Sequence, residues 1–252
     1  MTKHTISFKD YLHAFGDRMF VRRLMFKTLG NFLILISLFF TFKTFYEPLV
    51  AEATYFIESK IIQKQYVVAD GSTSPNQPQN PLPIAKTPPV SQFARFFNIA
   101  QVETITPVNT EFAIVIPKIA ANSPILPNIN PGDEREYLSA LQQGVAHAAG
   151  TNFPGGGGHV FLFAHSTDYV WNVDAYNAVF YLLYKLEPGD EIYLYYQGRR
   201  YIYVMESNTV VDPDRVEYLT RETNDEFLTL QTCWPPGTTL KRLLVFARLK
   251  AN

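Results

Sequence analysis

One long apolar segment constrains this chain more than any other feature. Residues 28–42, TLGNFLILISLFFTF, carry no charged side chain and are dense in Leu, Ile and Phe. Such a run rises only about 22 Å as a helix, but apolar and aromatic neighbours extend it toward the roughly 30 Å of a bilayer core. The sequence therefore predicts a transmembrane helix over residues 28–46. Four basic residues precede it: Arg18, Arg22, Arg23 and Lys27.

This distribution of charge predicts an orientation. The flanks of membrane helices that stay in the cytoplasm carry an excess of Lys and Arg. We therefore expect residues 1–27 to be cytoplasmic and the chain after the helix to be exported. Two alternatives to an uncleaved anchor remain. One is a cleaved signal peptide, because AEA at residues 51–53 offers small residues at a cleavage site. The other is a buried helix of a soluble protein.

Composition divides the exported part into three segments. Residues 47–69 have apolar residues at loosely helical spacing, which predicts a juxtamembrane helix. Residues 70–92 are rich in Pro, Ser, Asn and Gln, which is typical of a semi-rigid linker. Residues 93–252 are long enough to bury a core as one domain. The balance of 22 Lys and Arg against 23 Asp and Glu gives no reason to propose a nucleic acid as partner.

Short runs of β-forming residues dominate this domain. They are rich in Val, Ile, Phe, Tyr and Leu, and several are bounded by Gly, Pro or Asp. The pattern favours a mostly β fold, a closed or nearly closed barrel with a few short helices. Helices are expected at residues 132–150 and 177–186, and YYQGRRY is typical of a hairpin turn. The predicted strands are 111–119, 158–166, 191–197, 199–211, 226–233 and 241–249.

The single cysteine, Cys233, ends one of these predicted strands. A lone cysteine is often a small buried hydrophobe, but outside the cytoplasm it can also be intermolecular or reactive. If residues 226–233 and 241–249 form neighbouring antiparallel strands, Arg242 lies close to Cys233. A guanidinium there would favour the thiolate or bind an oxyanion.

A reactive thiol needs a base, and the chain has five histidines. His4 and His13 lie on the cytoplasmic side of the predicted anchor. His147 falls on a predicted helix and is expected to be satisfied or exposed. His159 and His165 flank one strand at a separation of about 20 Å, too far to share a metal ion. His165 ends that strand, where a barrel rim can present a catalytic group. We predict no metal site and no cofactor.

Three motifs then occur in order: FLFAHS, LTLQTC and KRLLVFA. Together with the N-terminal anchor they resemble the sortase family, membrane-anchored cysteine transpeptidases of the bacterial cell surface. The resemblance covers about residues 112–249 and implies a sortase-like barrel. It implies that Cys233 is the nucleophile, that His165 exchanges protons with the amines, and that Arg242 steadies the oxyanion. It also places Thr232 near the substrate.

The resemblance assigns a loop to the substrate groove as well. Residues 207–226, which precede the LTLQTC motif, correspond to this loop and would place Val216, Tyr218 and Leu219 there. Some sortases bind calcium near this loop. Here Thr220 and Arg221 stand where an acidic residue would be expected, so no calcium site is predicted.

The implied reaction is acyl transfer. An LPxTG-like sorting signal would be cleaved through a thioester on Cys233, and the acyl group would pass to an amine. The partners would be exported proteins with a C-terminal sorting motif and an amine acceptor, either a cell-wall precursor or a pilin lysine. The protein would be single-pass in the cell membrane with its catalytic domain outside. An exported cysteine hydrolase using the same residues and an inactive anchored β-barrel remain alternatives.

Overall fold

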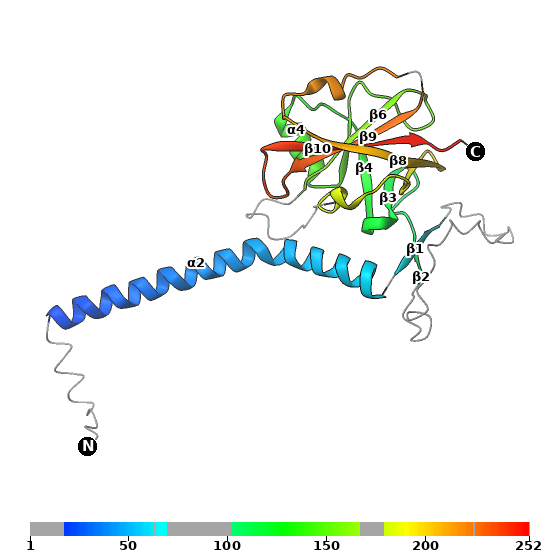
Figure 1. Ribbon diagram of the computed structural model, residues 1–252. Coiled ribbons are helices and arrows are strands. Elements are labelled where there is room, and N and C mark those ends of the chain that lie inside the picture. The colour runs from blue at the N-terminus through cyan, green and yellow to red at the C-terminus, as the bar shows by residue number, and fades with distance from the viewer. Residues whose placement is uncertain (1–17, 63, 70–101, 167–178, 224, 252) are drawn as a thin grey trace. The chain divides into compact units, whose positions relative to one another are not determined.

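The computed structural model describes residues 18–62, 64–69, 102–166, 179–223 and 225–251 (Figure 1). The chain divides into two units, Met1–Val50 and Ala51–Asn252. The predicted linker at residues 70–92 lies outside the described residues.

A single long helix, α2, runs from Arg18 to Phe56. Its stretch Met19–Lys43 has 25 residues and a mean hydropathy of 1.7, and its side chains are not buried. At 1.5 Å per residue such a stretch is about 37 Å long, enough to cross a bilayer core. This segment includes most of the predicted span 28–46, but it begins earlier and ends at Lys43.

The predicted juxtamembrane helix is wrong at its C-terminal end. A π-helical turn, η1 (Ile57–Ile62), follows α2, and residues 65–68 then form strand β1 (Gln65–Val68). The sequence QYVV explains the change, because β-branched and aromatic side chains favour strands. Strand β1 pairs in parallel with β2 (Val102–Ile105), which follows the predicted linker.

Within the described residues, eight strands close into a barrel in the order β10-β8-β7-β3-β4-β5-β6-β9 (Figure 1). Closure leaves no exposed sheet edge in the barrel. The predicted fold class, a mostly β closed barrel with short helices after an apolar helix, is confirmed. The strands are β3 (Phe112–Ile116), β4 (Ala121–Ile129), β5 (Val145–Ala148), β6 (His159–Phe163), β7 (Glu191–Tyr196), β8 (Arg199–Val211), β9 (Phe227–Trp234) and β10 (Lys241–Leu249).

Side-chain alternation along these strands separates an inner face from an outer face. Val160 and Leu162 of β6, and Leu228 and Leu230 of β9, belong to the main core cluster inside the barrel. Phe161, between the first pair, packs outside against helix α4 (Glu134–Leu141). The outer face of β6 is therefore a second packing surface.

Local chemistry explains how the barrel turns. The predicted hairpin YYQGRRY joins β7 to β8, and its two central residues, Gln197 and Gly198, both have positive φ angles of 50° and 73°. This backbone matches the twist of the flanking strands. The described residues also include three short 3-10 helices, η2 (Pro117–Ile119) in the short connection from β3 to β4, and η3 (Leu183–Lys185) and η4 (Val216–Tyr218) in longer connections.

The helix predicted at residues 132–150 is only partly correct. Helix α4 begins after Asp133, whose side chain accepts from the amides of Arg135 and Glu136, and it ends at Leu141. The following residues form β5, so His147 lies on a strand and not on a helix. Gly144, just before β5, lets the backbone lie close to β4, because a Cβ atom there would be only 2.4 Å from the carbonyl oxygen of Pro124.

The second predicted helix, at residues 177–186, is also shorter than expected. Its described part, from residue 179 onward, is a turn followed by the 3-10 helix η3. Residues 177 and 178 lie outside the described part of the chain.

Candidate active site

Two of the predicted catalytic residues lie on neighbouring strands, β9 and β10, and the third, His165, follows the end of β6. Strand β9 lies between β6, which is parallel to it, and β10, which is antiparallel (Figure 1). Cys233 of β9 pairs directly with Arg242 of β10. Paired residues on adjacent strands project to the same face of a sheet. The thiol and the guanidinium therefore start from the same face.

The register between β6 and β9 places His165 beside Cys233. Phe163 pairs with Gln231, and the amide of Ala164 donates to the carbonyl of Gln231 at 3.1 Å. Continuing this register puts His165 opposite Cys233. Adjacent strands are about 4.8 Å apart. The three predicted residues thus form one row, in which His165 lies two residues beyond the end of β6.

The row lies on the outer face of the barrel. Because Leu228 and Leu230 point inward, the odd-numbered residues of β9, including Cys233, point outward. The side chains of Cys233 and His165 are both partly exposed. Substrate can therefore approach this row from outside the barrel and not through its interior.

Two opposing influences act on the pKa of the Cys233 thiol. Burial raises it above its ordinary value, and the positive charge of Arg242 lowers it, with burial the stronger of the two. The thiol form therefore predominates at neutral pH, and a base must remove its proton when it attacks.

The guanidinium of Arg242 is held by the loop between β9 and β10. Its Nη1 donates to the carbonyl oxygens of Thr239 and Lys241, both at 3.1 Å. Arginine has five N–H donors. Within the part of the chain that the structure describes, its other N–H groups make no hydrogen bond, so they can serve a substrate.

The structure places Thr232 on the inner face of β9. Its side chain is buried and points into the barrel, opposite to Cys233, and its Oγ1 donates to the carbonyl of Ala164 at 3.0 Å. This placement follows from the alternation of side chains along β9. The prediction that Thr232 lies near the substrate stays a prediction. Thr232 ties β9 to β6 at the residue before His165.

The predicted groove residues lie in the loop between β8 and β9, at and after η4. Val216 is 63% exposed, which leaves it available to a ligand. Tyr218 stacks on Phe246 of β10 with ring centroids 5.9 Å apart, and Leu219 packs against the cluster that contains Phe161. Two of the three residues therefore fix the loop to the outer face, and Val216 faces solvent.

The other described histidines are unsuited to act as the base. His147 is fully buried; its Nδ1 accepts from the amide of Asn128 at 3.2 Å, and its Nε2 lies 3.0 Å from the carbonyl of Asn152. Burial lowers its pKa. His159 is 4% exposed, and burial with the nearby Arg221 charge lowers its pKa to about 4. Both are held neutral away from Cys233.

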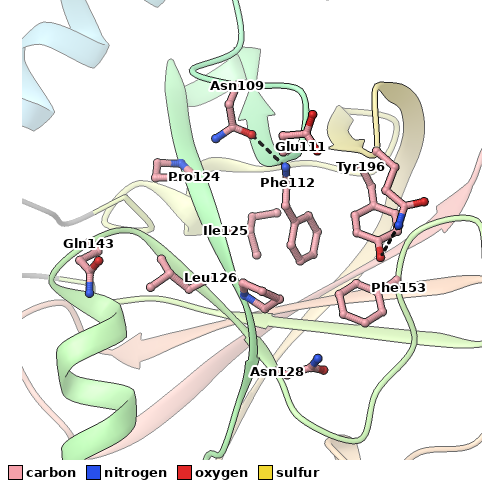
Figure 2. A pocket seen from close by; sticks show the side chains of 12 residues that line it. Asn109, Glu111, Phe112, Pro124, Ile125, Leu126, Asn128, Gln143, Phe153 and Tyr196 are labelled. Atoms are coloured by element: carbon pink, nitrogen blue, oxygen red, sulfur yellow. Dashed lines mark hydrogen bonds between the residues drawn. The ribbon is translucent and has the colours of Figure 1, made fainter.

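A pocket of about 810 Å³ is lined by residues of β3, β4 and β7 and of neighbouring loops (Figure 2). Three rings line it, those of Phe112, Phe153 and Tyr196. It contains none of the residues of the row, so it is separate from the candidate active site. Among the described residues, no group of three or more His, Cys, Asp and Glu side chains could hold a metal ion.

A family model described as the sortase domain matches residues 114–250, which is more than half of this chain. Sortase D of Bacillus subtilis (strain 168) is 27% identical over 136 residues, which cover 53% of this chain and 60% of that protein.

Solved structures of similar sequence are found as well. Sortase C1 of GBS pilus island 1 is 29% identical with a TM-score of 0.47, and the match covers 56% of this chain and 64% of that one. Sortase C-1 from Actinomyces oris is 30% identical with a TM-score of 0.47, covering 57% and 76%. The chain spans less than two thirds of the length of the Bacillus protein and of the GBS protein.

Proposed function

Because this chain belongs to the sortase family, we propose that it is a membrane-anchored cysteine transpeptidase that cleaves an LPxTG-like sorting signal and transfers the acyl group to an amine. The observation that carries the proposal is the row formed by Cys233 of β9, Arg242 of β10 and His165, which follows β6. A nucleophile, a base and an oxyanion donor are the parts that acyl transfer requires.

The first half of the reaction forms a thioester. The sulfur of Cys233 attacks the carbonyl carbon of the scissile peptide while His165 takes the thiol proton. The C–N bond then breaks, and His165 gives that proton to the leaving amine. A thiol that is protonated at rest, as burial of Cys233 favours, supports this order of proton transfers.

The second half regenerates the enzyme. An amine attacks the thioester carbon, His165 takes the proton that the amine loses, and the thiolate of Cys233 leaves and recovers the proton. In both halves negative charge develops on the carbonyl oxygen. Arg242 would donate to that oxygen through the N–H groups that do not bind Thr239 and Lys241.

The substrates would be exported proteins that carry a C-terminal sorting motif. The acceptor would be the amine of a cell-wall precursor or of a pilin lysine. We propose that the motif binds along the outer face beside the β8–β9 loop. The exposed side chain of Val216 supports contact with the substrate, whereas Tyr218 and Leu219 support the loop from beneath.

The proposed location is the cell membrane, with residues 1–27 inside and the barrel outside. The apolar stretch Met19–Lys43 supports a single membrane crossing. The basic residues at its N-terminal end support the cytoplasmic side for that end.

Product analysis tests the proposal directly. The full chain in detergent micelles would be incubated with a library of LPxTG-like peptides and an amine, and the products would be identified by mass spectrometry. We expect cleaved peptide joined to the amine, and no product from Cys233→Ala with an unchanged circular dichroism spectrum. Release of the acid alone, even with amine in excess, would identify a hydrolase. No cleavage of any peptide would indicate that the barrel is inactive. Either result, release of the acid alone or no cleavage, would overturn the proposal.

A further inference from the structure

Both neighbours of Cys233 on β9 are anchored on the inner side of the barrel. Thr232 is bound to Ala164. Trp234 packs partly against the core inside the barrel, where its ring lies 5.3 Å from that of Tyr184 in η3. Because consecutive side chains of a strand point to opposite faces, these two anchors set the direction in which the thiol of Cys233 points.

Tyr184 is in turn held by the end of helix α2. Its hydroxyl donates to the carboxylate of Glu52, and Lys185 forms an ion pair with the same carboxylate at 3.2 Å. The ammonium of Lys185 also lies over the rings of Tyr55 and Tyr184, 5.2 and 4.7 Å from their centroids. One turn of the helix thus makes polar and cation–π contacts with η3.

These contacts are partly shielded from water. The side chains of Lys185 and Glu52 are 27% and 35% exposed, and Tyr55 packs against the barrel core. Burial together with the hydrogen bond to Glu52 raises the pKa of Tyr184 to about 12. The hydroxyl of Tyr184 therefore stays protonated and keeps donating at neutral pH.

We propose that Glu52 and Tyr184 are positioning residues for the nucleophile, with the Glu52 carboxylate fixing Tyr184, whose ring fixes Trp234 and so the direction of the Cys233 thiol. The end of the helix that leaves the membrane is then a part of the catalytic apparatus. The inference rests on the proposed function for its effect on acyl transfer, and it adds residues that lie outside the row and touch no substrate.

The test compares Glu52→Gln, Tyr184→Phe and the double variant with the unaltered full chain in detergent micelles. Tyr184→Phe removes the hydrogen bond, and Glu52→Gln removes the negative charge that strengthens this bond and pairs with Lys185, while both changes keep the shape of the side chain. We expect each to slow single-turnover thioester formation by about threefold to tenfold, with the KM for peptide unchanged. Because both act through one contact, the double variant should be no slower than the slower single variant.

A chemically matched pair elsewhere in the barrel serves as the control. Glu191 accepts a hydrogen bond from Tyr193 and pairs with Lys250 at 2.8 Å, but it lies on β7, which is not a neighbour of β9. We expect Glu191→Gln and Tyr193→Phe to acylate at the unaltered rate. An equal loss in these controls, strictly additive losses in the double variant, or unaltered rates for Glu52→Gln and Tyr184→Phe would overturn the inference.

A second measurement needs no sorting peptide. Cys233 is the only thiol of the chain, so its alkylation by iodoacetamide can be followed by mass spectrometry. Release of Trp234 would expose the thiol, and because burial is what raises its pKa, we expect faster alkylation at neutral pH in both helix-contact variants. An unchanged or slower alkylation would contradict the positioning role. If the unaltered chain transfers no peptide at all, the proposed function fails while this measurement still decides whether the contact positions the thiol.

Discussion

At the scale of single residues, Arg242 has two possible roles beside Cys233. Its charge lowers the pKa of the thiol, whereas its planar fork can donate two hydrogen bonds at fixed angles. The contacts of Nη1 with two loop carbonyls favour the second role, because they fix the plane of the guanidinium and aim the remaining donors. A charge alone would not need such fixed geometry.

The substitution Arg242→Lys separates these roles. It keeps the charge but replaces the fork with a single ammonium group. We expect a folded domain whose thioester formation in a single turnover is slower by at least about tenfold, roughly 1.4 kcal/mol of barrier. Arg248→Lys, at the other end of β10, is the matched control and should acylate normally. Acylation by Arg242→Lys at the unaltered rate would rule out the fork as the catalytic feature.

The sequence predicted the members of the row more readily than their arrangement. Cys233 and Arg242 could be paired from local pattern, because they end and begin two strands joined by a short loop. The place of His165 at a strand end made it a candidate base, but its closeness to Cys233 followed only from the resemblance to sortases, since β6 and β9 are parallel and the residues they bring together are 68 positions apart. The inward direction of Thr232 became evident only once the inner face of β9 was known.

At the scale of elements, aromatic and cation–π contacts hold the β8–β9 loop against the outer face of the barrel. The guanidinium of Arg221 lies 5.0 Å from the ring centroid of Phe227. Beneath it His159 is buried, with Nε2 2.8 Å from Oγ1 of Thr229. The Arg221 charge disfavours a proton on His159, so the contacts of this loop with the outer face are most stable while the His159 ring is neutral.

This arrangement predicts a loss of stability in acid. In the unfolded chain a histidine has a pKa of about 6.5, whereas burial and Arg221 lower the pKa of His159 to about 4 in the folded state. Between these values the unfolded chain binds a proton that the folded chain does not. The contribution of His159 to the free energy of unfolding is therefore complete above a pH of about 6.5. It decreases by about 1.4 kcal/mol per pH unit as the pH falls to about 4.

The measurement is the free energy of unfolding of the Ala51–Asn252 unit within the full chain, followed against pH. His159→Gln can still donate to Thr229 but cannot be protonated. We expect its stability to fall less steeply with acid than that of the unaltered chain. Identical pH dependence for the two proteins would show that His159 does not titrate in this way.

The sequence predicted some strands of the barrel and missed others, and each outcome has a physical reason. The bounds of β8 and β10 were predicted correctly, because long β-branched and aromatic runs and a Gln-Gly turn define them. Strand β4 was missed because Pro124 and Pro127 lie within it and proline is rare inside sheets. Strand β5 was assigned to a helix because Ala and His in VAHA carry no strong preference for a strand.

At the scale of the whole molecule, the boundary of the barrel domain differs from the prediction of residue 93. Strand β1 precedes residues 70–92 and pairs with β2, which follows them. Val68 packs with Tyr195 on the barrel, and the hydroxyl of Tyr195 donates to the carbonyl of Ala69 at 2.5 Å. The chain is thus attached to the barrel before the Pro-rich segment begins. The length of that segment does not set the separation between residues 51–69 and the barrel.

The proposed orientation in the membrane can be tested with the one thiol of the chain. Cys233 is the single cysteine and is partly exposed, so a maleimide that cannot cross membranes should label it in intact cells if the barrel lies outside. Since burial raises the pKa of this thiol, labelling should become faster as the external pH is raised. Cys233→Ala should give no signal, and permeabilised cells should give no more label than intact ones. Label that enters only after permeabilisation would place the barrel in the cytoplasm, where exported sorting signals could not be its substrates.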